Sequence, residues 1–274
     1  MQRYFLAIGI ALLLIGCQVG QSTLKLPDAN QVIRDQLVIQ SDVRLPARHR
    51  LLDELVAGRE DLCQKLSLPT SDEPISVYLF KNETDYRAFM EDQYPGFPGR
   101  RAIFVKNDTT LKVFAFWGER VGEDLRHEVT HAYLHSVVPN VPLWLDEGLA
   151  EFFEVGRGRH GVHRAHVAVL AEAYRAQTWL PNLRHLEGLE NSEEMTELEY
   201  AESWLWTHFL LESTADNLKL VQDQMARLRM TAEAEPLVEQ MHKQLPDAAN
   251  QLIEHLRFLA EQQSPKEIAT AQSK

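Results

Sequence analysis

The strand-like patterns of this sequence are confined to its first half, and only helix-like patterns follow them. Residues 75–80, 101–105 and 111–117 are rich in β-branched and aromatic side chains, which is typical of buried strands. Beyond residue 143 the apolar side chains recur every three or four positions, which predicts helices alone. We therefore expect an α+β protein in which a small sheet precedes a helical C-terminal half.

The other segments divide between helices and a poorly patterned N-terminal region. Residues 18–45 show no sustained period and predict a tether, with one short strand or helix near residues 31–39. Residues 46–66 predict a helix, because Pro46 suits a first helical turn and apolar residues recur after it. The further expected helices comprise residues 83–93, 122–138, 143–155, 162–178, 198–213, 216–230, 233–244 and 247–262.

The N-terminus carries a short apolar run, residues 5–15, after one positive charge at Arg3. The run is shorter than the roughly 20 residues that span a bilayer as a helix, and it is typical of a secretory signal. It ends in Leu14-Ile15-Gly16-Cys17, which resembles the lipobox of bacterial lipoproteins. The resemblance implies cleavage before Cys17, acylation of that cysteine and, because Gln18 follows it, the periplasmic face of the outer membrane. An uncleaved anchor helix is the alternative.

Charge and cysteine content exclude several classes of partner and site. The chain has 40 acidic and 28 basic residues and a net charge of −12, so we expect no nucleic-acid binding. Its two cysteines, Cys17 and Cys63, exclude a disulfide framework and a cysteine-rich metal site. Cys63 lies on an apolar helical face, where a buried hydrophobic role is the simpler interpretation. Any metal ion must therefore be held by histidine and carboxylate side chains.

The segment HEVTH, residues 127–131, matches the pattern H-E-x-x-H. On a helix His127 and His131 lie one turn apart on one face, close enough for two imidazoles to bind one Zn²⁺. Glu128 points to a different side and suits a general base for a metal-activated water. A returning helix from residue 143 would bring Glu147 level with His131, which predicts a site for one Zn²⁺ per chain with an open fourth position.

HEVTH followed by WLDEGLAEFF resembles the gluzincin branch of zinc metallopeptidases, and more narrowly the peptidase-MA-like proteins of bacterial envelopes. The resemblance implies a zincin-like sheet, His127, His131 and Glu147 as ligands, and Glu128 as base. It also places a tyrosine at the head of a later helix, which makes Tyr200 the first candidate for stabilising the oxyanion. His208 and Tyr133 are weaker candidates. In zincins the strand before the metal helix, here residues 111–116, lies at the sheet edge and pairs with extended substrates.

Several nearby side chains have simpler interpretations. Asp146 either orients a ligand histidine or caps the returning helix. Glu151 is a rival third ligand, although a supporting or exposed position fits it better. Trp144 is expected in the core, and His135 too far from the metal to bind it. The histidines at positions 160, 163 and 166 form either a second metal site or, more simply, part of a loop and a solvated helix face.

The sequence thus predicts a membrane-anchored zinc metallopeptidase that acts on a peptide or protein substrate. Two alternatives stay open: a catalytically silent lipoprotein that keeps the fold as a scaffold or binding module, and a zinc amidase that acts on a non-protein amide. The oligomeric state is left open. The predicted segments are a signal peptide (1–16), a tether and N-terminal helix (17–73), a zincin-like core (74–156), a helical subdomain (157–263) and a flexible tail (264–274).

Overall fold

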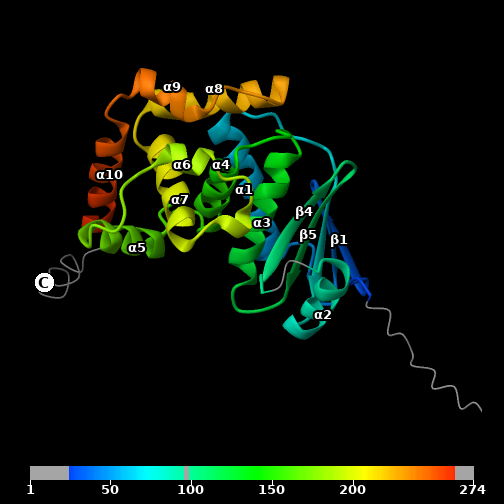
Figure 1. Cartoon of the computed structure of the whole chain (residues 1–274). Coiled ribbons are helices and arrows are strands. Elements are labelled where there is room, and N and C mark those ends of the chain that lie inside the picture. The colour runs from blue at the N-terminus through cyan, green and yellow to red at the C-terminus, as the bar shows by residue number, and fades with distance from the viewer. Residues whose placement is uncertain (1–24, 96–98, 263–274) are drawn as a thin grey trace, which may run out of the picture.

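The computed structural model describes residues 25–95 and 99–262 (Figure 1). The predicted signal segment and Cys17 lie outside these residues. The described part is an α+β protein, as the sequence patterns predict, with a five-stranded sheet followed by a helical half. No helix within the described ranges is long and apolar enough to cross a membrane.

The sheet is mixed, with the strand order β1-β2-β3-β5-β4. Its strands are β1 (Asn30–Arg34), β2 (Leu37–Ser41), β3 (Ile75–Phe80), β4 (Ala102–Asn107) and β5 (Thr110–Phe116). The central strands β2, β3 and β5 run parallel, whereas β1 and β4 are antiparallel to their neighbours. The last two strands form a hairpin in which Asn107 pairs with Thr110.

The N-terminal region contributes more to the sheet than the sequence predicts. Residues 30–41, expected to lie in a tether with one short element, form the complete hairpin β1–β2, which extends the sheet by two strands. Leu37 and Ile39 of β2 are almost fully buried. Alternation over only five residues is too short to stand out in the sequence, and the sheet supplies the partner that stabilises it.

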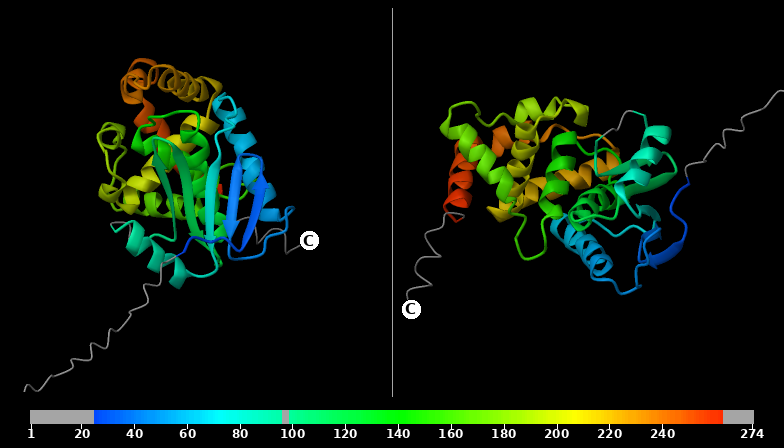
Figure 2. Two further views of the ribbon diagram at one scale, coloured as in Figure 1. Left: turned by 90° about the vertical axis from the view of Figure 1, so that its right-hand side faces the viewer. Right: turned by 90° about the horizontal axis from the view of Figure 1, so that it is seen from below.

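Helices cover one face of the sheet, and a single helix covers part of the other face (Figure 2). Helices α1 (Arg50–Leu66) and α3 (Val121–His135) pack against one face, over Ile75, Val77 and Val113. Helix α2 (Glu83–Gln93) covers the other face with an aromatic cluster around Phe80 and Phe114. The sheet is therefore buried on both sides where α2 lies, at Phe80 and Phe114, while burial alternates along β2 and the first part of β3.

The helical half is built around α4 (Leu143–Glu154) and α7 (Glu197–Glu212), which pack against each other. Trp144 and Trp204 are fully buried between them, so Trp144 belongs to the core, as expected. The surrounding helices are α5 (Arg164–Arg175), α6 (Leu183–Glu187), α8 (Ala215–Thr231), α9 (Leu237–Gln244) and α10 (Ala248–Gln262). A short 3-10 turn, η1 (Ser192–Glu194), precedes α7.

Helices α3 and α4 follow each other directly and pack side by side between the sheet and the helical half (Figure 1). Residues 136–142 connect them, and Pro142 stands immediately before the first turn of α4. This helical hairpin places residues from the middle of α4 beside residues from the middle of α3, as the sequence analysis expects for Glu147 and His131.

Candidate functional site

The two histidines of HEVTH lie on one face of α3. His127 and His131 are one turn apart, and their Nε2 atoms approach each other to 3.3 Å. Both side chains are largely buried. Two imidazole nitrogens at this separation point into a common space instead of out to solvent, which is the arrangement that one shared ion requires.

Glu147 of α4 completes the group. Its Oε2 atom lies 3.5 Å from Nε2 of His127 and 3.7 Å from Nε2 of His131. The same oxygen is buried and has no hydrogen-bond partner. A buried carboxylate oxygen without a donor is costly unless an ion or a proton satisfies it. The three side chains therefore fit a metal ion, and they form a group of possible metal ligands within 4.8 Å of one another.

The other ring nitrogens of both histidines are held by carboxylates. Nδ1 of His127 donates to Glu154 at 3.0 Å, and Nδ1 of His131 donates to Asp146 at 2.9 Å. These bonds fix the tautomer that leaves Nε2 free for a metal ion. Asp146 therefore orients His131, a candidate ligand, and its second oxygen accepts a hydrogen bond from His135.

The carboxylates also govern the protonation of the two rings. Burial lowers the pKa of His131, but Asp146 and Glu147 outweigh burial and raise this pKa to about 9. The pKa of His127 is likewise raised, because hydrogen bonds to Glu147 and Glu154 outweigh its burial. Burial raises the pKa of Glu147, but the two histidines lower it overall. A metal ion must displace protons from this pair of rings, so binding is linked to pH.

Glu147, Glu151 and Glu154 form a stripe along α4, spaced by four and three residues, and each contacts histidines. Glu154 bridges His127 and Nε2 of His163, the latter at 2.9 Å. Glu151 accepts from Nε2 of His166 at 2.9 Å. It therefore faces α5 and supports the histidines there, while Glu147 faces the histidines of α3.

A second group of possible ligands consists of Glu151, His163 and His166. The two rings stack face to face at 3.8 Å, so their Nε2 lone pairs do not converge on one point. Nδ1 of His163 accepts from the backbone of His166, which puts the ring proton on Nε2, where it bonds Glu154. This geometry favours a supporting role over a second metal site. His160 lies elsewhere, in the wall of a separate pocket.

Glu128 lies against the edge of the sheet. Its Oε2 atom accepts a hydrogen bond of 2.6 Å from the backbone amide of Phe104 in β4. An amide that donates to Glu128 points away from the neighbouring strand, so the outer edge of β4 faces the site. The expectation that residues 111–116 form the sheet edge is wrong: β5 lies between β3 and β4, because the hairpin adds β4 outside it.

Tyr200 stands in the first turn of α7, on the other side of the site. Burial and the neighbouring Glu147 raise its pKa, while Arg100 lowers it. Its hydroxyl accepts from Nη2 of Arg100 at 3.4 Å and lies 3.4 Å from the carbonyl oxygen of Ser192. Tyr200 thus has Glu147 as a charged neighbour, and its role as the oxyanion donor stays a prediction.

Gly148 explains why α7 approaches α4 so closely beside Glu147. A Cβ atom at this position would lie 2.5 Å from the carbonyl oxygen of Ser203 and 2.2 Å from Oγ1 of Thr207. Only glycine leaves room for such an approach of two helices. Because Glu147 and Gly148 are adjacent, a possible ligand lies directly beside the contact between α4 and α7 that positions Tyr200.

The weaker oxyanion candidates have other environments. Nδ1 of His208 is bonded to Nε2 of His255 at 2.9 Å, within the helical core. The hydroxyl of Tyr133 is buried and has no hydrogen-bond partner, and its pKa is raised, with Arg59 and Asp35 as its charged neighbours.

 Burial is the main cause of that raised pKa. Arg59 belongs to α1 and Asp35 to the β1–β2 turn, so the hydroxyl of Tyr133 faces that side of α3 and not the ligand histidines.

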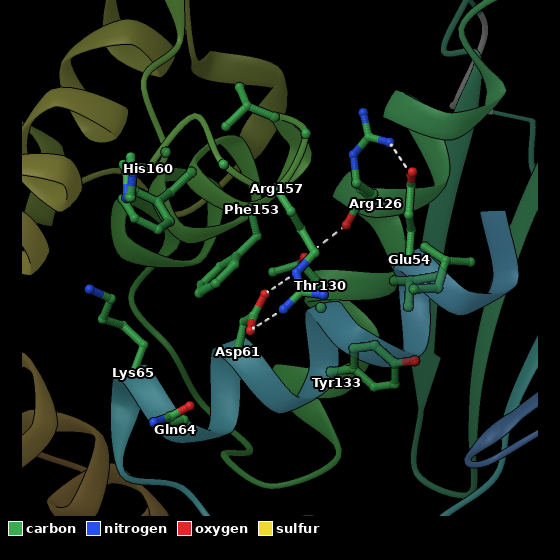
Figure 3. A pocket seen from close by; sticks show the side chains of 18 of the residues that line it. Glu54, Asp61, Gln64, Lys65, Arg126, Thr130, Tyr133, Phe153, Arg157 and His160 are labelled. Carbon is green, nitrogen blue, oxygen red and sulfur yellow. Dashed lines mark hydrogen bonds and ion pairs between the residues drawn. The ribbon is translucent and has the colours of Figure 1, made fainter. Parts of the chain in front are cut away.

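A pocket of about 550 Å³ lies on the other side of α3 (Figure 3). Its wall includes Arg126 and Thr130 of α3, not the two ligand histidines. Arg157 pairs with Asp61 across this pocket, and Arg126 lies 3.3 Å from Glu54. The charged side chains that line it are thus largely paired with each other, and the pocket is separate from the candidate metal centre.

Three contributors to the site were not predicted from the sequence: Glu154, His163 and Arg100. The spacing of Glu154, seven residues after Glu147, places it on the same helical face and is a usable signal. His163 was noted only as a member of a histidine cluster. Arg100 carries no local signal, because it reaches Tyr200 across a hundred residues of sequence.

The described chain thus combines a small mixed sheet with a group of histidines and glutamates on two successive helices. In the comparison with known families, a family model described as the Peptidase MA superfamily matches residues 63–238. The chain therefore belongs to the peptidase MA superfamily, which supports a peptidase or a related activity. No curated protein sequence matches the chain significantly.

Proposed function

We propose that the protein is a zinc-dependent metallopeptidase of the gluzincin type, with His127, His131 and Glu147 as the ligands of one Zn²⁺. The observation that carries the proposal is the convergence of two Nε2 atoms and the unpartnered Oε2 atom of Glu147. A purely structural zinc site is closed by four protein ligands, whereas three ligands leave a position for water. Glu128 beside them argues against a silent scaffold, which has no use for a base.

Each part of the proposed hydrolysis is assigned to particular residues. Bound Zn²⁺ would supply a Lewis acid and lower the pKa of a water molecule towards about 7. Glu128 takes the proton of that water and later delivers it to the leaving amine. Tyr200 donates a hydrogen bond to the oxyanion that develops on the attacked carbonyl group. The outer edge of β4 pairs with an extended peptide through main-chain hydrogen bonds.

The decisive experiment compares the wild type with Glu128→Gln in digests of casein and of a peptide library. We expect the variant to keep one zinc per chain by elemental analysis and to lose hydrolysis, because an amide cannot accept the proton. Glu119→Gln makes the same chemical change at an exposed position before α3 and should leave hydrolysis unchanged. Equal cleavage by wild type and Glu128→Gln contradicts the mechanism, and cleavage by neither favours the scaffold.

Metal binding is tested separately with His131→Ala. We expect the zinc content to fall well below one per chain, since two donors remain. Zinc that survives this substitution unchanged would refute the site. A zinc amidase is distinguished by substrate: cleavage of a cell-wall crosslink without cleavage of any peptide bond supports that alternative.

We also propose that the protein is anchored in the bacterial cell envelope by lipid on Cys17, at the periplasmic face of the outer membrane. The support is the lipobox-like Leu14-Ile15-Gly16-Cys17 after a short apolar run. Cells that express Cys17→Ser should not label the protein with radioactive palmitate, whereas Cys63→Ser should label normally. Label on both variants would contradict the anchor.

A further inference from the structure

Arg100 is a half-buried cation that forms no ion pair with a described residue. It stands just before β4, and its Nη2 atom donates to Oγ of Ser192 at 3.1 Å and to the hydroxyl of Tyr200 at 3.4 Å. Both partners are neutral. Across residues 25–95 and 99–262, no carboxylate lies within ion-pair distance of its guanidinium group. A half-buried charge that is bonded only to hydroxyl groups lacks the direct carboxylate contact that a guanidinium group can make.

The neighbouring Arg101 shows what the fold does with an arginine that is structural. Its guanidinium group makes a two-pronged contact with the carboxylate of Asp124, at 2.6 and 2.9 Å. Arg59 likewise pairs with Asp35. Arg100 differs from both because it has no carboxylate partner among the described residues, and neither its Nε nor its Nη1 atom has a hydrogen bond to a described residue. It therefore retains donors for a ligand.

Arg100 also lies next to the candidate centre. Burial lowers its pKa, but the neighbouring Tyr200, Glu147 and Glu128 outweigh burial and raise it, so the side chain stays charged. It is four residues before Phe104, whose amide contacts Glu128 at the outer edge of β4. An extended peptide that pairs with this edge and continues past Ala102 would reach Arg100.

We propose that Arg100, together with Ser192, binds a carboxylate group of the substrate within a few residues of the scissile bond. The inference rests on the proposed peptidase function, and it adds a preference for one class of peptide. A planar guanidinium group with free donors matches a carboxylate in a two-pronged contact. The carboxylate has two sources, a peptide C-terminus or the side chain of Asp or Glu, and both supply the same chemistry.

The test measures kcat/KM of the zinc-loaded full chain on matched quenched peptides. One series compares Glu with Gln at each position around the cleaved bond, and another compares a free C-terminus with its amide. We expect the wild type to favour a carboxylate at one position by about tenfold to a hundredfold, the range typical of hydrogen bonds to a charged group. The series in which the preference occurs identifies the source.

Substitutions at position 100 then test whether Arg100 causes the preference for a carboxylate. Arg100→Gln should lower kcat/KM for the carboxylate peptide by about tenfold or more, with little change for the amide peptide. Arg100→Lys keeps the positive charge but lacks the two-pronged donor geometry of the guanidinium group, so it should restore part of the preference. Arg229→Gln removes the same charge from the exposed surface of α8 and should behave as the wild type.

Any one of three results would overturn the proposal. The first is a wild type without a preference for a carboxylate, and the second is a preference that Arg100→Gln keeps. The third is an equal loss of kcat/KM for both peptides in Arg100→Gln, which would mean that Arg100 acts on Tyr200 or on the reacting carbonyl. If the wild type cleaves no peptide, the proposed function fails, and binding decides the inference alone. Isothermal titration of the same peptides should then show carboxylate-dependent binding that Arg100→Gln abolishes, and its absence refutes the site.

Discussion

Glu154, the last residue of α4, accepts a hydrogen bond from Nδ1 of His127 at 3.0 Å and another from Nε2 of His163 at 2.9 Å. The carboxylate thus connects His127 of α3, a proposed ligand, to His163, which stands immediately before α5. Burial raises the pKa of Glu154, but its two histidine partners lower it to about 2, so it is ionised at neutral pH. It holds the His127 ring in an orientation that leaves Nε2 free to bind a metal ion.

Loss of this carboxylate should weaken metal binding. We expect Glu154→Gln to lower zinc affinity by about tenfold to a hundredfold, because the ring of His127 loses its charged acceptor. The measurement is competition for zinc against a chromophoric chelator. Glu172→Gln, an exposed glutamate of α5, serves as the control and should bind zinc as the wild type does. An unchanged affinity in Glu154→Gln would mean that packing alone orients His127.

Removal of the Tyr200 hydroxyl should affect catalysis and not metal content. If Tyr200 stabilises the oxyanion, Tyr200→Phe should lower kcat by about a hundredfold to a thousandfold with a small change in KM. Zinc per chain should stay at one, as elemental analysis would show. The matched change Tyr174→Phe in α5 should leave kcat unchanged. A similar kcat in both variants would remove Tyr200 from the mechanism.

Gly148→Ala should destabilise the fold through the contact between α4 and α7. The added Cβ atom overlaps the backbone of Ser203, so the helices must separate, at a cost of about 1–3 kcal/mol or more. Gly58→Ala is the control, because a Cβ atom at that position of α1 meets nothing within 4 Å. It should stabilise the protein by about 0.5–1 kcal/mol. Urea unfolding gives both values, and equal effects would contradict the close packing.

Acid should destabilise the protein through His208. Burial and the neighbouring His255 lower the pKa of His208 to about 3, whereas an unfolded histidine titrates near 6.5. The folded state therefore binds fewer protons, so this contribution to stability is present above about pH 6.5 and is lost as the pH falls towards 3. Between pH 7 and pH 5 the loss amounts to about 2 kcal/mol.

The measurement for His208 is urea unfolding at both pH values. His208→Phe should unfold with a smaller difference between pH 7 and pH 5 than the wild type. The exposed His242→Gln should keep the wild-type difference. Other titrating groups are shared by all three proteins and cancel in the comparison. An undiminished difference in His208→Phe would assign the acid sensitivity to other groups.

The α+β class and the helical hairpin of α3 and α4 were predictable because their signals are local. The period of the apolar residues changes within short windows, and HEVTH places its own side chains one turn apart. The meeting of Glu147 with the two histidines was predictable from the rise per residue of two antiparallel helices. The resemblance to peptidase-MA-like proteins added the expectation for Tyr200.

The remainder depends on contacts between distant segments. In the sheet β4 lies outside β5, and no pattern within residues 111–116 indicates which strands flank β5. The hairpin β1–β2 is stabilised by its pairing with β3, more than thirty residues away. Arg100 meets Tyr200 only because the start of β4 and the start of α7 lie side by side in the folded chain. Such pairings are set by packing of the whole molecule.

The three proposed ligands belong to one continuous stretch of chain, from His127 to Glu147, whereas Arg100 and Tyr200 flank it from either end of the sequence. Contacts between near neighbours in the chain form with little loss of loop entropy. The helical hairpin therefore contains by itself the groups needed to capture an ion. Selectivity for the substrate, by contrast, depends on the two remote segments that carry Arg100 and Tyr200. Metal binding and substrate selectivity can therefore be altered independently by substitution.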